Sequence, residues 1–71
     1  MSEDEAILEE AMDNLREAHQ RIRATQGRMR SEGLSEHPDY RDLATRVSMA
    51  LASTEAAYME ARRYSDRGSK Q

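Results

Sequence analysis

The two histidines, His19 and His37, are the first residues to consider for catalysis or metal binding. His19 has no His, Cys, Asp or Glu three or four positions away in either direction. It therefore lacks the neighbouring ligand of a helical metal site. His37 directly precedes Pro38, where we expect it to cap a helix. The chain has no Cys and no glycine-rich phosphate loop. We therefore predict no enzymatic activity, no metal and no cofactor.

Regular charge patterns are the second candidate for function. Four carboxylates recur at intervals of four and repel one another unless a cation pairs with them; they are Glu5, Glu9, Asp13 and Glu17. Arg16, Arg23 and Arg30 recur at intervals of seven. On a helix these arginines stand roughly 10 Å apart along one line. Such a row either forms a solvated face or contacts a phosphate backbone.

The composition limits the class of protein. The net charge is −3 and the isoelectric point is about 5.3, so the chain as a whole is no polycation. No stretch approaches the roughly 20 apolar residues of a membrane span, and the acidic N-terminal residues lack the basic region of a signal peptide. We therefore expect a cytoplasmic protein that does not interact with membranes.

The elements that must position these residues are two helices. Ser2 and Glu5 have the spacing of a capping box, and Gly33 suits the left-handed position after a helix, with Leu34 packing back on Met29. These features predict a first helix over about 3–31. Pro38 fits the first turn of a second helix over about 38–66, with Ser35 or His37 as its cap. Residues 1–67 then form one helical domain, and residues 68–71 a frayed tail.

Apolar periodicity predicts that the two helices pair as an antiparallel hairpin. Leu8, Leu15, Ile22 and Met29 recur at intervals of seven, with small residues between them, as in a coiled-coil stripe. Facing this stripe with the second helix places large residues opposite small ones. The predicted core pairs are Leu8 with Ala61, Ala11 with Tyr58, Leu15 with Thr54, Ala18 with Leu51, Ile22 with Val47, Thr25 with Ala44, and Met29 with Tyr40.

The two helices of a hairpin meet along one line of contact, which we call the seam, and apolar residues remain outside it. Such exposed apolar surface usually marks an interface. Ile7 and Met12 lie to either side of the expected seam. We predict a homodimeric, all-α four-helix bundle. Its interface is expected to contain Leu43, Ala50, Ala57, Tyr64 and Met12. A second stripe is either isolated surface residues or an adaptable partner surface; it contains Met49, Ala52, Ala56 and Met59.

The leading functional prediction is protein–protein interaction, as an adaptor, assembly factor or regulator whose protein partner the sequence does not identify. In length and topology the expected dimer resembles the plasmid RNA-binding Rop hairpins. A shared fold does not carry function, so the row of Arg16, Arg23 and Arg30 is the feature that makes nucleic-acid binding an alternative. A structural part of a larger assembly, such as a component of a phage or other particle or one subunit of a hetero-complex, is a third interpretation.

Overall fold

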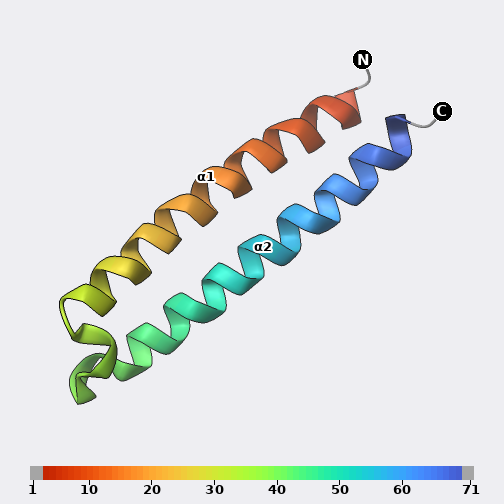
Figure 1. Ribbon diagram of the computed structural model, residues 1–71. Coiled ribbons are helices and arrows are strands. Elements are labelled where there is room, and N and C mark those ends of the chain that lie inside the picture. The colour runs from red at the N-terminus through yellow and green to blue at the C-terminus, as the bar shows by residue number, and fades with distance from the viewer. Residues whose placement is uncertain (1–2, 70–71) are drawn as a thin grey trace.

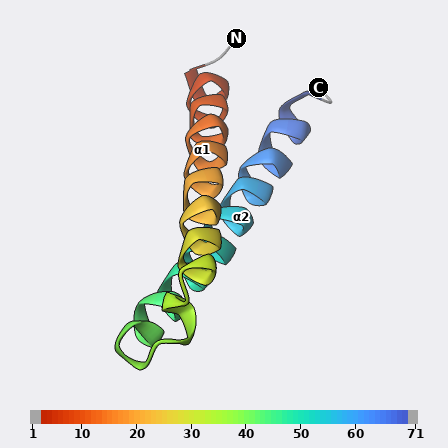
Figure 2. The same cartoon turned by 60° about the vertical axis from the view of Figure 1, so that its left-hand side comes forward.

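The computed structural model describes residues 3–69 and is all-helical. Helix α1 spans Glu3–Ser31 and helix α2 spans Arg41–Ser69. Two short 3₁₀ helices, η1 (Leu34–Glu36) and η2 (Pro38–Tyr40), connect them. The long helices run antiparallel and pack against each other, so that the first and last described residues lie at the same end (Figure 1). They cross at an angle and spread apart toward that end (Figure 2). The all-helical class and the packing of two helices are confirmed.

The helix boundaries follow the charges and caps in the sequence. Helix α1 begins with Glu3, Asp4 and Glu5 at its positive end, as the helix dipole favours. The predicted capping box includes Ser2, which lies outside the described residues. Helix α2 begins three residues later than predicted and continues to Ser69, beyond the predicted end near residue 66. Residues 68 and 69 therefore belong to the helix, and residues 70 and 71 lie outside the described part.

The connection between the helices depends on Gly33 and His37. Gly33 has φ 75°, a left-handed conformation that glycine adopts without a steric penalty, and its N–H donates to the Arg30 carbonyl at 3.1 Å. The Asp39 N–H donates to His37 Nδ1 at 3.1 Å, which makes His37 the cap. Pro38 opens a 3₁₀ turn instead of the α-helix itself, so α2 starts only at Arg41.

A narrow seam takes the place of a core. Met29 is the only buried residue in the part of the chain whose side chains are described. Partly buried residues on α1 are Leu8, Ala11, Met12, Leu15, Ala18, His19, Ile22 and Gln26. Those on α2 are Ala44, Val47, Leu51, Thr54, Tyr58, Ala61 and Ser65. The predicted core includes Thr25 and Tyr40, but both are exposed.

The pairing of the helices is shifted by about one turn from the predicted one. Hydrogen bonds across the seam include those from Gln26 Nε2 to Ser48 Oγ at 2.9 Å and from Arg16 Nη2 to the Tyr58 hydroxyl at 3.2 Å. Met29 shares a groove with Ala44 and Val47, not with Tyr40. The reason is the longer connection. Tyr40 belongs to η2, and the centres of its ring and the His37 ring lie 5.2 Å apart. The seam of α2 therefore begins at Ala44.

The hairpin is far from globular. Its extents are 51 × 15 × 14 Å and its radius of gyration is 15.8 Å, whereas a compact chain of this length has about 11 Å. Its accessible surface is 5925 Å², against about 4500 Å² for a globular monomer of this mass. No helix within residues 3–69 is long and apolar enough to cross a membrane.

Candidate interaction surfaces

The seam divides the long sides of the hairpin into two faces. On one side, a groove of about 300 Å³ is lined by Arg21, Ile22, Thr25, Arg46, Val47 and Ala50. Leu43, Ala57 and Tyr64 lie one or two heptads from Ala50 on α2, and Ile7 lies two heptads before Arg21 on α1. Residues a heptad apart share a helix face. We call the surface made by Ile7, Leu43, Ala50, Ala57 and Tyr64 the Leu43 face.

The Leu43 face exposes large apolar side chains at both of its ends. Leu43 near the connection is 53% exposed, and Tyr64 and Ile7 toward the termini are 51% and 56% exposed. The two alanines between them are also exposed. Ile7 was not among the predicted interface residues. Ile7 lies one heptad before Asn14 and two heptads before Arg21. This spacing was the signal that could have identified Ile7 as part of the face.

Met12 does not belong to the Leu43 face. It lines a groove with Glu5, Glu9, Asp13, Arg16 and Ser65, which lies on the other side of the seam. The physical reason is helical geometry. Residues three and four positions after Leu8 lie on opposite sides of it around the helix. Ala11, three positions on, lies toward the Leu43 face, and Met12, four positions on, lies toward the other side. The prediction that Met12 joins Leu43 in one interface is therefore wrong.

The opposite side, which we call the Met59 face, is more polar. A groove of about 280 Å³ is lined by Arg16, His19, Glu55, Tyr58 and Met59. Met59 is 52% exposed and Met49 63%, and Ala52 and Ala56 are exposed as well. The structure thus places the second predicted stripe on the surface of α2, with Met59 beside the seam.

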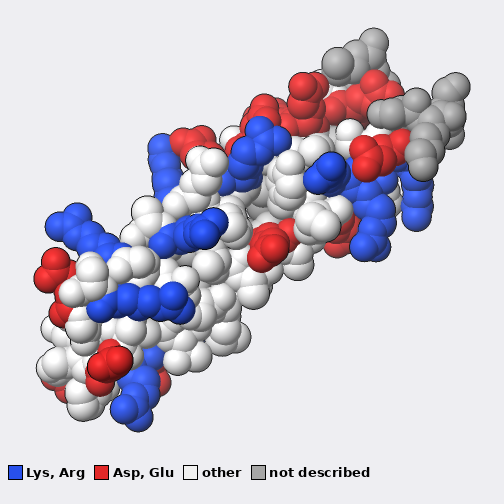
Figure 3. Space-filling view, in the orientation of Figure 1, with Lys and Arg blue, Asp and Glu red and all other residues white. Residues whose placement is uncertain are grey.

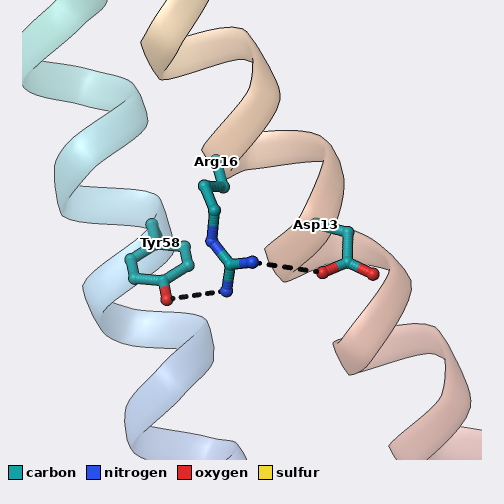
Figure 4. Close-up of polar contacts among 3 residues, drawn as sticks. All are labelled: Asp13, Arg16 and Tyr58. Carbon is teal, nitrogen blue, oxygen red and sulfur yellow. Dashed lines mark hydrogen bonds and ion pairs between the residues drawn. The ribbon is translucent and has the colours of Figure 1, made fainter.

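Arg16 is held across the seam of the Met59 face and does not stand free. Besides its bond to Tyr58, its Cζ lies 5.6 Å from the centre of the Tyr58 ring, and its Nη1 lies 3.7 Å from Asp13 Oδ1 (Figure 4). The hydrogen bond to Tyr58 raises the pKa of the Arg16 guanidinium. Its charge is therefore present at every physiological pH. Of the predicted arginine row, Arg23 is exposed and Arg30 lines a separate groove near Arg41.

Charges on the hairpin are segregated along its length. Acidic side chains gather over the beginning of α1, and basic side chains lie over the middle, the connection end and the end of α2 (Figure 3). Residues 3–20 hold seven acids and one Arg, and residues 21–34 hold four Arg and one Glu. Arg21 forms an ion pair with Glu17 within α1. The hairpin therefore has an acidic and a basic half along α1.

The described residues contain no group of three or more His, Cys, Asp or Glu side chains that could hold a metal ion. His37 accepts a backbone hydrogen bond in the connection, and His19 lies partly buried beside the seam. The surface features of this hairpin are suited to contacts with another macromolecule, through its apolar residues and its segregated charge.

Comparison with known proteins found no family model, no curated protein and no solved structure that matches the chain.

Proposed function

We propose that the chain is a non-enzymatic interaction protein that works as a homodimer, with the Leu43 face as the contact between its two hairpins. The observation that supports this proposal is the lack of a core. Met29 is the only described side chain that is buried, while Leu43, Tyr64 and Ile7 remain more than half exposed on one side. Folding of so short a chain needs more apolar burial than this seam supplies.

The dimensions of the hairpin support the same proposal. A face 51 Å long and 15 Å wide is comparable with the ~800 Å² that each partner buries in an interface of standard size. Closing two such faces forms a four-helix bundle, whose core collects the apolar residues that one hairpin leaves exposed. A second copy of the chain is available to cover the Leu43 face wherever the protein is present, at the concentration of the protein itself.

The dimer leaves the Met59 face on its outside. Met49 and Met59 are flexible, polarizable side chains that adapt to varied apolar surfaces, and the Met59 groove adds Arg16, His19 and Glu55 as polar contacts. We propose this face as the surface for a protein partner, so that the dimer acts as an adaptor, assembly factor or regulator.

A pair of matched substitutions tests the dimer. Leu43→Glu places a charge on the proposed interface, and Met49→Glu places the same charge on the Met59 face. The new Glu at residue 43 lies in the first turn of α2, where the helix dipole favours it, so the helix is not weakened by the change itself. Light scattering at micromolar concentration is expected to give a monomer for Leu43→Glu and a dimer for Met49→Glu. A dimer that survives Leu43→Glu unchanged would contradict the proposal.

Nucleic-acid binding through the arginine row remains an alternative with less support. Arg16 is engaged by Tyr58 and Asp13, which leaves Arg23 and Arg30 from the predicted row. A shift assay with RNA and DNA, titrated with salt, tests this alternative because phosphate contacts weaken steeply as salt is added. Absence of a shift at low salt would eliminate it. Membership in a larger particle is tested by capture of the tagged chain from its native host.

A further inference from the structure

We infer that the second copy lies on the Leu43 face end for end, with its connection beside the chain termini of the first copy. This inference rests on the proposed dimer and adds its symmetry. A two-fold axis can lie in the plane of the face either along the hairpin or across it. The first choice puts both connections at one end, and the second puts them at opposite ends.

The apolar stripe of α2 is symmetric about its own centre. Leu43 and Tyr64 are equally distant from a point between Ser53 and Thr54, and so are Ala50 and Ala57. An axis across the hairpin at this point lays α2 antiparallel on α2 of the second copy. Leu43 then meets Tyr64 of the second copy, and Ala50 meets Ala57. The exposed large residues of α2 cover each other at both ends, and the alanines allow the helices to approach in the middle.

The charges beside this stripe agree with the same axis. Arg46 lines the groove of the Leu43 face, and Glu60 occupies the same position two heptads later. The axis between Ser53 and Thr54 lays Arg46 of each copy over Ala61 of the other, so that Glu60 lies one residue away from Arg46. On α1 it lays the acidic half, residues 3–20, over the half of the second copy that contains Arg21 and Arg28.

The other axis brings like charges together near the connections, and brings the acidic half of α1 to the end of α2 that contains Arg62, Arg63 and Arg67. With both connections at one end, α1 of each hairpin lies on α2 of the other. The half of α1 that contains Arg21 and Arg28 then faces the beginning of the second α2, which contains Arg41 and Arg46. Juxtaposed like charges oppose association and suppress wrong arrangements. The self-complementary apolar stripe of α2, in which Leu43 covers Tyr64 of the second copy, therefore selects the end-for-end arrangement.

The absence of Cys from the chain allows a direct test by disulfide formation. Two variants, Ala50→Cys carrying a tag and Ala57→Cys without it, are refolded together, oxidised, and separated on non-reducing gels. We expect a mixed disulfide between the two variants as the main cross-linked product. Each variant alone should cross-link poorly, because equivalent residues 50 are offset by about 10 Å along the helices, too far for a disulfide. Ala52→Cys, on the Met59 face, is the matched control and should not cross-link with Ala57→Cys.

The outcomes separate this inference from the proposed dimer. A dimer by light scattering with the mixed 50–57 disulfide supports both. A dimer in which Ala50→Cys cross-links to itself as readily as to Ala57→Cys, or in which neither product forms, overturns the end-for-end arrangement and leaves the dimer intact. A monomer by light scattering, measured on the unaltered chain, overturns the dimer and the inference with it.

Discussion

At the scale of single residues, two glycines of the chain have different conformational roles. Gly27 lies within α1, and a Cβ built on it meets no atom within 4 Å. Gly33 ends the helix with φ 75°, a conformation that costs residues with a Cβ about 1 kcal/mol or more. Only the second position needs glycine for its backbone.

Replacing each glycine by alanine is therefore expected to change stability in opposite directions. Gly27→Ala should raise the free energy of unfolding by about 0.5–1 kcal/mol, since alanine is the better helix former. Gly33→Ala should lower it by about 1 kcal/mol, because the left-handed conformation becomes strained. Urea denaturation at equal protein concentration measures both. A change of the same sign for the two variants would contradict this account of the connection.

At the scale of the helices, the sequence predicted the elements better than their pairing. Apolar residues recurring at intervals of seven identified both helices and the side on which they meet, and Gly33 marked the end of α1. The pairing failed by about one turn because Pro38 was interpreted as the start of α2, whereas it starts the separate turn η2. Shifting the pairing by one turn places Leu15 opposite Tyr58 and Ala11 opposite Ala61, so the matching of large with small residues that predicted the pairing did not determine it.

Polar contacts determine which residues face each other across the seam, which the apolar pattern did not determine. Gln26 is partly buried and its amide donates to Ser48 of α2, whereas Thr25 is exposed in the groove of the Leu43 face. Arg16 reaches across to Tyr58 instead of joining Arg23 in a free row. Both choices depend on which residue of α2 lies opposite, and that was not known until the length of the connection was known.

Two methionines test whether stability resides in the seam. Met29, in the last turn of α1, is 7% exposed, and Met49, within α2, is 63% exposed. Met29→Ala should lower the free energy of unfolding by about 2 kcal/mol, because it leaves a cavity. Met49→Ala should change it by less than about 0.5 kcal/mol. The measurement is urea denaturation at one concentration. Equal losses for the two variants would show that Met29 does not anchor the seam.

At the scale of the whole molecule, the large exposed surface of the hairpin is the property that favours association with a second chain. The elongated shape and the surface of 5925 Å² follow from pairing only two helices. Composition and periodicity predicted that excess of apolar surface, together with the side on which Leu43 and Tyr64 lie. The prediction that Met12 lies on that side was wrong. Ile7 and Met12 both flank the seam stripe of α1, but they lie on opposite sides of it.

The central claim is that two copies of the hairpin form the working unit, and its most direct test is the mass of the unaltered chain in solution. Sedimentation equilibrium across micromolar concentrations is expected to give twice the 8.1 kDa of the single chain. Circular dichroism of the same samples should show helix. A folded, helical species that sediments as a single chain throughout this range would contradict the claim.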